Sequence, residues 1–329
     1  MERIYIKNKE YKLVSLFSGI GGLDLGFEFA GFETIWANDF DKFAVETYLA
    51  NVNSHIVYGD IRLVKHQIPD HDVLIGGFPC QPFSTLGKLQ GFEDERNRGT
   101  LFFEIMDIIT SHDTKVVVLE NVKNLINHDK GRTFSRIRQE LDNAGYDVNA
   151  QILNSQDYGI PQRRNRVFIV AFNRKYFKSS DFAYPNKEEL KITTQDLLDK
   201  TVEEKYFLTK KLEHTILGMG TKGYLVKPTI DLAISKTLTA TMHKMHRASQ
   251  DNYVTDLVNF ERNVTDKEKR IPIRKLTPNE CRQLQGFPSD WKQVVSDCQA
   301  YKQFGNAVTV DVAYKVACQV LDYMENNKI

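Results

Sequence analysis

The sequence predicts a doubly wound α/β fold, in which a Rossmann-like parallel sheet is covered by helices on both faces and is joined to a second, smaller domain. Apolar runs continuous enough for strands buried on both faces alternate with stretches of helical spacing over the first half of the chain. A long polar stretch then interrupts this alternation. The 329 residues, 41% hydrophobic and 26% charged, are enough for one large core and a smaller one.

The elements of the predicted sheet follow one another in a regular order. Strands are expected at residues 12–17 (KLVSLF), 33–38 (ETIWAN), 55–60 (HIVYGD), 72–77 (DVLIGG), 115–121 (KVVVLEN) and 166–172 (RVFIVAF). Helical stretches are expected at residues 21–31, 41–51, 100–110 and 133–145, and an amphipathic helix over 307–327 closes the chain. In such a sheet, ligands bind at the carboxyl ends of the strands.

The polar stretch from about Phe182 to Arg270 is rich in Lys, Thr, Asn and Asp, and it predicts the separate smaller unit. Within it, residues 236–242 (KTLTATM) are a short strand candidate. A helix start follows, with Thr277 as the N-cap, Pro278 at the first position and Glu280 three residues after the cap.

The composition excludes several classes of protein. The longest apolar runs, residues 116–119 and 167–172, are far shorter than the roughly 20 residues that a membrane helix needs. Because the N-terminal residues also lack a signal-peptide core, we expect a cytoplasmic protein. Four widely spaced cysteines, without a CxxC pair or a neighbouring histidine cluster, predict neither a disulfide framework nor a metal site.

The net charge of +1 does not reveal a partner, although basic residues gather at 236–247 and again at 262–275. On charge alone, such clusters are more typical of a solvated face than of a nucleic-acid surface.

A glycine-rich loop, FSGIGG, follows the first strand and predicts a cofactor that approaches the backbone at a helix N-terminus. The dinucleotide pattern GxGxxG, read from Gly19, places Asp24 at the third glycine, which counts against NAD. About 20 residues further on, either Asp39 or Asp41 could bind ribose hydroxyls, and Phe40 between them could stack on an adenine ring.

Asp60, at the end of the third strand, could accept a hydrogen bond from an adenine amino group. Any one of these aspartates alone is more often a helix cap or a turn residue. Their serial arrangement at successive strand ends favours a cofactor site.

A cysteine and a glutamate follow the fourth and fifth strands at the same edge of the sheet. Cys80 lies between Pro79 and Pro82 in GGFPCQPFS, where the prolines restrict the turn, and it would need a positive environment to act as a nucleophile. Glu120, in the sequence ENV, is a candidate acid or hydrogen-bond acceptor beside it. The other three cysteines, Cys281, Cys298 and Cys318, are interpreted as small buried hydrophobic residues.

Six motifs, in order and over nearly the full chain, resemble those of the DNA cytosine-5 methyltransferase family of the compact prokaryotic or phage restriction-modification type. They are FSGIGG, GFPCQPFS, ENV, QRRNRVFIV (162–170), RKLTPNECRQLQGFP (274–288) and FGNAV (304–308). The resemblance implies a Rossmann-like methyltransferase sheet with a smaller target-recognition domain. Residues 1–185 and 304–329 would form the catalytic and cofactor-binding domain, and residues 186–303 the target-recognition domain and hinge.

The resemblance also implies S-adenosyl-L-methionine as the cofactor and S-adenosyl-L-homocysteine as its product. Phe17, Gly19 and Gly21 would line the methionine side, Asp39 would bind the ribose, Phe40 and Ile61 would enclose the adenine and Asp60 would contact its amino group. The pocket would be completed by Pro79, Leu101, Asn306 and Ala307.

Catalysis would then centre on Cys80, whose thiolate adds to C6 of cytosine so that C5 can accept the methyl group. Glu120 would stabilise the adduct, Arg164 would hold the cytosine O2, and Arg166 would orient Glu120. The base would have to be rotated out of the duplex.

Double-stranded DNA is the partner that the resemblance implies. In the loop over residues 84–99, Ser84, Lys88 and Arg98 would contact phosphates or the active site as the loop closes. In the middle region, the expected contacts to DNA are Thr237, Leu238, His243, Lys244, His246 and Arg247.

Two other functions stay open at this point, a tRNA cytosine-5 methyltransferase on the same scaffold and an inactive DNA-binding relative. The long basic middle region favours DNA, and the presence of Cys80, Glu120 and the glycine loop favours an active enzyme. We expect a monomer without a metal or a membrane partner. Any companion restriction endonuclease would not be in a physical complex with it.

Overall fold

The computed structural model describes residues 10–52, 55–78, 101–178, 181–218, 229–244 and 249–329. The chain divides into two compact units. The sheet unit comprises Met1–Leu153, Asn165–Lys187 and Val312–Ile329, and the second unit comprises Asn154–Arg164 and Glu188–Asp311. These boundaries place residues 304–311 in the second unit, although the sequence motifs had grouped them with the catalytic domain.

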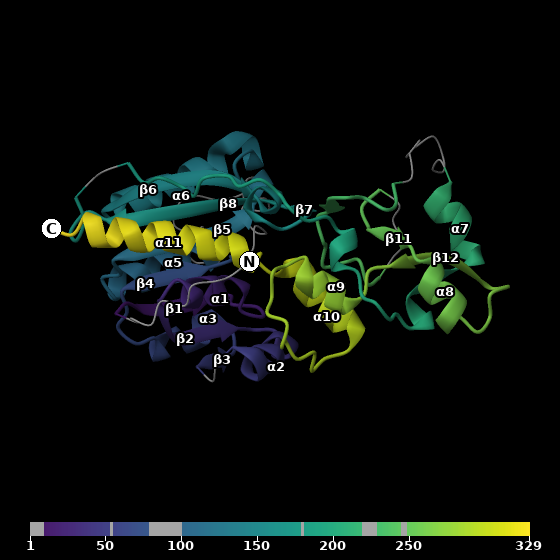
Figure 1. The fold of residues 1–329 in the computed structure, drawn as a ribbon. Coiled ribbons are helices and arrows are strands. Elements are labelled where there is room, and N and C mark those ends of the chain that lie inside the picture. Colours follow the sequence, from purple (N-terminus) through teal and green to yellow (C-terminus); the bar gives the residue numbers. More distant parts are fainter. Residues whose placement is uncertain (1–9, 53–54, 79–100, 179–180, 219–228, 245–248) are drawn as a thin grey trace. The chain divides into compact units, whose positions relative to one another are not determined.

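The sheet unit is built on seven strands in the order β3-β2-β1-β4-β5-β8-β6 (Figure 1). The strands are β1 Lys12–Leu16, β2 Glu33–Asp39, β3 Ile56–Tyr58, β4 Val73–Gly76, β5 Val116–Val122, β6 Tyr146–Asn154 and β8 Asn165–Asn173. The pairs from β3 through β5 are parallel, whereas β8 runs antiparallel to β5. The predicted doubly wound α/β class is therefore confirmed for a sheet that is mostly, but not wholly, parallel.

Helices cover both faces of this sheet. They are α1 Gly22–Phe29, α2 Lys42–Asn51, α3 Ile61–Val64, α5 Leu101–Ser111, α6 Arg132–Asn143 and α11 Val310–Asn326. Apolar residues of α5 and α6 share one core cluster with Leu119 and Ile169 of the strands. Phe172 lies three residues after Ile169 in β8 and therefore points to the opposite face of the sheet. There its ring stacks on Tyr323 of α11, with 3.9 Å between the ring centroids. Figure 1 shows α11 lying across the sheet on that face.

The second unit holds short strands and helices. A three-stranded antiparallel sheet has the order β11-β12-β9, with β9 Phe207–Thr209, β11 Tyr253–Thr255 and β12 Arg270–Lys275, and a parallel pair joins β7 Gln162–Arg163 to β10 Ser235–Lys236. Its α-helices are α7 Lys210–Leu217, α8 Leu257–Asn263, α9 Pro278–Gln283 and α10 Asp297–Asn306. The predicted capping box at the start of α9 is confirmed, because Thr277 and Glu280 each accept a hydrogen bond from the other's backbone N–H.

The strand predicted over residues 236–242 is wrong beyond Lys236. β10 pairs with β7, but the Lys236 N–H and carbonyl bond to the Asn252 side chain and not to a second strand. Further on, the Met242 N–H bonds to the Thr239 carbonyl in a turn. Thr237, Thr239 and Thr241 are β-branched, which favours a strand, but the side chains of Gln162 and Arg164 bond to the Leu238 N–H and carbonyl.

The three described cysteines differ in exposure. Cys281 is buried and burial raises the pKa of its thiol, as expected for an inert hydrophobic residue, and Cys318 is half-buried. Cys298 is exposed, so its predicted burial is wrong. It lies in the first turn of α10, whereas Ala300, Tyr301 and Phe304 supply the buried side of that helix.

Among the helices in the described ranges, none is long and apolar enough to cross a membrane. The same ranges contain no group of three or more His, Cys, Asp or Glu side chains that could hold a metal ion.

Candidate active site

The glycine loop after β1 has a sharply turned backbone. Gly19 and Gly21 have φ angles of 56° and 83°, and Phe17 has a φ of 54°, which is a costly conformation for an aromatic residue. The Gly21 N–H closes the turn on the Ser18 carbonyl at 2.8 Å, and α1 begins at the next residue. The loop thus reaches the helix N-terminus with a strained residue at its entry, as ligand-binding loops often do.

The structure separates the two aspartates that the sequence left open for ribose binding. Asp39 is 7% exposed, and its two carboxylate oxygens accept hydrogen bonds from the N–H groups of Gly19 and Asp41, each at 2.8 Å. Asp41 instead caps α2 through the Phe43 N–H at 3.0 Å. Between them, Phe40 is 72% exposed, which leaves the aromatic ring open to solvent. Asp39 is therefore the carboxylate tied to the loop, and Asp41 is the helix cap.

At the end of β3, Asp60 caps α3 through the Arg62 N–H at 3.0 Å and also pairs with the Arg62 guanidinium. Hydrogen bonds from that guanidinium hold the pKa of Asp60 below its usual range, so its carboxyl group is an ionised acceptor at neutral pH. Ile61, next in the chain, is 2% exposed. Leu101, the remaining described candidate of the sheet unit, is half-buried at the start of α5.

Where β5 ends and β8 begins, Glu120 forms an ion pair with Arg166. The Arg166 Nε lies 3.0 Å from Glu120 Oε1, and the Glu120 side chain is 10% exposed. The antiparallel register of β5 and β8 pairs Val122 with Arg166, so that Glu120 and Arg166 project from one face as diagonal neighbours. Sequence alone did not reveal this pairing direction.

The ENV motif also contacts the segment that leads to the nucleophile motif. The Asn121 side chain donates a hydrogen bond to the Phe78 carbonyl at 2.8 Å, and a Cβ atom placed on Gly77 would lie 3.6 Å from Glu120 Oε2. Sequence reasoning missed Asn121, although its place inside the motif was a signal that could have found it. Cys80, Pro79 and the loop candidates Ser84, Lys88 and Arg98 lie outside the described residues.

Two of the three arginines of QRRNR, Arg164 and Arg166, belong to different units and have different partners. Arg166 lies in the sheet unit with Glu120, whereas Arg164 lies in the second unit and is 1% exposed. The Arg164 guanidinium donates to three main-chain carbonyls, those of Leu238 (2.9 Å), Gly305 (3.1 Å) and Ala307 (2.6 Å). This geometry does not favour the prediction that Arg164 holds the cytosine O2. It makes Arg164 a brace for the backbone of the second unit.

The last two cofactor candidates lie at the end of α10 in the second unit. Asn306 is exposed, while Ala307 is 9% exposed and its carbonyl accepts the hydrogen bond from Arg164.

The candidate recognition residues are anchored by the same QRRNR motif. The Leu238 N–H donates to Gln162 Oε1 at 3.0 Å, and the Thr237 hydroxyl donates to the Arg163 carbonyl. Leu238 is 2% exposed, so it packs inside the second unit and presents no side chain to solvent. Sequence reasoning missed Gln162 as the anchor of this segment.

The remaining candidates differ in their surroundings. The His243 Nδ1–H donates a hydrogen bond to the Ala240 carbonyl at 2.9 Å, and Lys244 is exposed. His246 and Arg247 lie outside the described residues.

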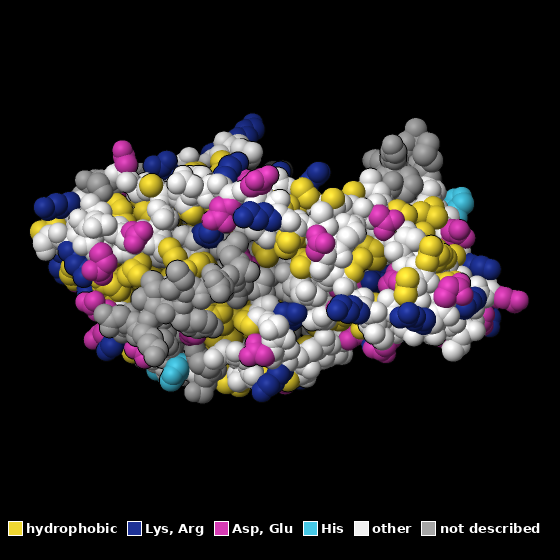
Figure 2. Space-filling model, in the orientation of Figure 1, with side chains coloured by type: hydrophobic (Ala, Val, Ile, Leu, Met, Phe, Trp, Pro, Cys, Tyr) yellow, Lys and Arg dark blue, Asp and Glu magenta, His cyan; other side chains and the backbone are white. Residues whose placement is uncertain are grey.

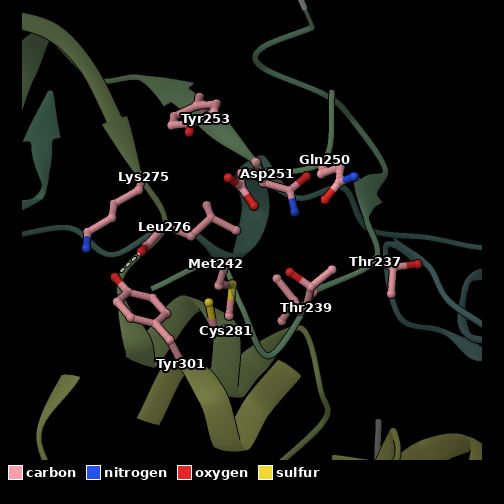
Figure 3. A pocket seen from close by; sticks show the side chains of 12 residues that line it. Thr237, Thr239, Met242, Gln250, Asp251, Tyr253, Lys275, Leu276, Cys281 and Tyr301 are labelled. Carbon is pink, nitrogen blue, oxygen red and sulfur yellow. Dashed lines mark hydrogen bonds between the residues drawn. The ribbon is translucent and has the colours of Figure 1, made fainter. Parts of the chain in front are cut away.

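Thr237 and Leu238 also line a small pocket in the second unit (Figure 3). Its volume of about 20 Å³ has room for roughly one water molecule. Figure 3 shows Asp251 and Cys281 on different sides of it, and the Tyr301 hydroxyl donating to the Leu276 carbonyl at 2.6 Å. The pocket is too small for a base or a cofactor.

Charge does not mark a DNA-binding surface on the face drawn in Figure 2, where basic and acidic side chains are interspersed.

Residues 11–322 match the family model of the C-5 cytosine-specific DNA methylases. The chain belongs to this family. Type II methyltransferase M1.ScrFI of Lactococcus lactis subsp. cremoris is 38% identical over 330 residues, which cover 98% of this chain and 81% of that protein. Type II methyltransferase M.Bsp6I of Bacillus sp. (strain RFL6) is 39% identical over 316 residues, which cover 93% and 97%. The methylase is thus a DNA cytosine-5 methyltransferase of the type II restriction-modification kind.

Solved structures resemble the methylase in fold. The S. pombe Dnmt2 methyltransferase superposes with a TM-score of 0.71 at 20% identity, over 95% of this chain and 98% of that chain. A putative DNA modification methyltransferase encoded within an E. coli prophage superposes with a TM-score of 0.70 at 20% identity, over 96% of this chain and 100% of that chain. At this identity the likeness concerns the fold alone.

Proposed function

We propose that the methylase transfers a methyl group from S-adenosyl-L-methionine to C5 of a cytosine that is flipped out of a short specific duplex sequence. The proposed reaction passes through a covalent adduct between Cys80 and C6 of the base. The observation that carries this proposal is the Glu120–Arg166 ion pair, which lies where β5 ends and β8 begins. There Glu120 also faces the backbone at Gly77, shortly before Pro79 and Cys80 in the sequence.

The residues at the ends of β1, β2 and β3 fit the cofactor. An adenosine needs an acceptor for ribose hydroxyls, an aromatic face and an acceptor for its amino group, and Asp39, the exposed ring of Phe40 and the ionised Asp60 offer these in turn. The turned backbone at Gly19 and Gly21 would hold the methionine side. When bound, the cofactor supplies an electrophilic methyl group.

Cys80 would make the base reactive. Cytosine C5 is a poor nucleophile, but addition of the Cys80 thiolate to C6 pushes an electron pair toward C5, which can then form a bond to the methyl group. Loss of the C5 proton returns the electron pair to the ring and expels the thiolate. The addition step therefore needs Cys80 as a thiolate, and the elimination step returns it in that form.

Glu120 would contact the edge of the target cytosine that carries N3 and the amino group, and stabilise the charge that develops there during the addition. The Arg166 Nε lies 3.0 Å from Glu120 Oε1 and so fixes the orientation of the carboxylate. We assign the positioning of the carboxylate to Arg166, and the bracing of Leu238 and Ala307 to Arg164.

Base flipping, closure of the loop over residues 84–99 and reading of the target by the second unit remain parts of this proposal. So do Thr237, His243, Lys244, His246 and Arg247 as contacts to DNA. Arg164 and Gln162 bond to the backbone of Leu238, so a fixed backbone would carry the reading loop. We also expect a cytoplasmic monomer that forms no complex with a companion endonuclease.

Methyl transfer from labelled cofactor tests the proposed substrate. Duplex DNA should accept label in the base and tRNA should not, and bisulfite sequencing of DNA from cells that express the protein should show one short methylated sequence. Label in tRNA alone would favour the tRNA enzyme, and no label in either would favour an inactive DNA-binding relative.

A further inference from the structure

A buried carboxylate lies behind the glycine loop, and the proposed chemistry does not use it. Asp24 is 0% exposed and belongs to the first turn of α1. Its Oδ1 accepts a hydrogen bond from the Tyr48 hydroxyl at 2.8 Å. Its Oδ2 is buried and makes no close hydrogen bond with any described residue. A carboxylate that is buried with so few partners is costly, which indicates a role that offsets the cost.

Tyr48 connects Asp24 to the loop itself. The residue is 0% exposed in α2, and a Cβ atom placed on Gly21 would lie 3.0 Å from Tyr48 Cε2 and 2.8 Å from Val52 Cγ2. The backbone at Gly21 therefore rests directly on the Tyr48 ring, in a conformation that only glycine adopts without strain. A shift of this ring would move the loop.

The glycine loop is also held at Gly19. Asp39 accepts a hydrogen bond from the Gly19 N–H, and α2 begins directly after the Asp39–Asp41 segment. The loop is thus held at Gly19 by a hydrogen bond to Asp39 and at Gly21 by packing against Tyr48. Asp24 in turn holds the Tyr48 ring through its hydroxyl.

We propose that Asp24 is a positioning residue for the cofactor, which holds Tyr48 against Gly21 and so sets the affinity of the glycine loop. The inference rests on the proposed function, because it takes the loop as the site of S-adenosyl-L-methionine. It adds a residue that never touches the cofactor but acts on it through Tyr48.

The charge on Asp24 should change near neutral pH. Burial raises the pKa of this carboxyl group to about 7, and the hydroxyls of Tyr48 and Ser15 partly oppose that rise. Two titratable groups face Asp24, Tyr48 from α2 and Glu28 from α1. The negative charge of Glu28 raises the pKa of Asp24 further. From β1, the group that faces Asp24 is the uncharged Ser15.

Ionised Asp24 accepts the Tyr48 hydrogen bond more strongly than the neutral acid does. A firmer loop should bind the cofactor more tightly, so affinity should rise with pH through about 7. By linkage, binding should lower the pKa of Asp24 and release a fraction of a proton.

The test is calorimetric binding of S-adenosyl-L-homocysteine to the full chain between pH 5.5 and 8.5, in buffers of different ionisation enthalpy. If binding lowers the Asp24 pKa by one unit, the wild type should bind about tenfold more tightly at the high end, with proton release near pH 7. Asp24→Asn should bind at all pH values with the low-pH affinity of the wild type, and without proton release.

Two further variants make the test decisive. Tyr48→Phe keeps the ring but removes the donor, and it should lose the pH dependence even if Asp24→Asn does not fold. Glu46→Gln removes an exposed carboxylate from the same helix and should behave as the wild type.

Wild-type pH dependence and proton release in a folded Asp24→Asn or Tyr48→Phe protein would overturn the inference. Absence of binding to the wild type would instead contradict the proposed cofactor site, and the inference with it.

Discussion

Glu120→Gln is expected to slow the single-turnover rate of methyl transfer by about a hundredfold or more, while the affinity for S-adenosyl-L-homocysteine stays unchanged. The amide keeps the shape of the side chain but carries no negative charge and cannot share a proton with the base. Because Glu120 lies at the strand ends with 10% of its side chain exposed, solvent cannot easily replace it. Rapid-quench measurement with labelled cofactor reports the chemical step directly.

The matched control is Glu140→Gln. Glu140 also pairs with an arginine, Arg136, at 2.6 Å, but it does so along α6. Its loss should leave the rate as in the wild type. Equal single-turnover rates for the wild type and Glu120→Gln would remove Glu120 from the proposed chemistry.

Arg274→Met is expected to lower the free energy of unfolding by about 3–5 kcal/mol, because it leaves buried carboxylates without their partner. Arg274 is 0% exposed, and its guanidinium binds Asp256 at 2.8 Å and both oxygens of Glu280 at 2.8 and 2.9 Å. Glu280 also closes the capping box on the Thr277 N–H, so the same change weakens the start of α9. Urea denaturation measures the loss.

The loss should depend on pH with a definite sign. Burial raises the pKa of Glu280, and Arg274 opposes that rise. Without Arg274 the pKa rises further, so the folded state disfavours the ionised carboxylate more strongly. The destabilisation should therefore be larger at pH 8 than at pH 5, where Glu280 can be protonated at less cost.

Lys269→Met is the control for Arg274→Met. It removes an exposed ion pair with Asp266 near the start of β12, and it should cause no measurable loss. Equal losses for the two variants would show that the buried network does not stabilise the second unit.

The sequence predicted the sheet unit well because its central strands are continuous apolar runs. β6, Tyr146–Asn154, was missed because only continuous apolar runs were taken as strands; its alternating polarity is typical of a strand at a sheet edge that is half-exposed along most of its length. The antiparallel direction of β8 was also missed, since nothing in a local apolar run such as RVFIVAF encodes the direction of its partner. Local patterns thus identified the strands but not how each strand pairs.

The candidate site was predictable in its motifs and less so in its contacts. Asp39 and Asp41 are the same residue type two positions apart, and only the hydrogen bond from Gly19 distinguishes them. The partners of Arg164 lie 74 to 143 residues away along the chain, beyond any local pattern. Asp24 appeared in the sequence only as a break in the dinucleotide pattern, and its burial against Tyr48 is a tertiary property.

Covalent trapping tests the central claim most directly. The substrate is a duplex with 5-fluorocytosine at the position found by bisulfite sequencing. In the presence of S-adenosyl-L-methionine, addition of Cys80 and methyl transfer should proceed. The final elimination should not, because fluorine replaces the C5 proton that must be lost. The account predicts a cofactor-dependent complex that survives denaturing electrophoresis, maps to Cys80 by mass spectrometry and is absent from Cys80→Ala. No covalent complex with the wild type, or one attached to another residue, would contradict it.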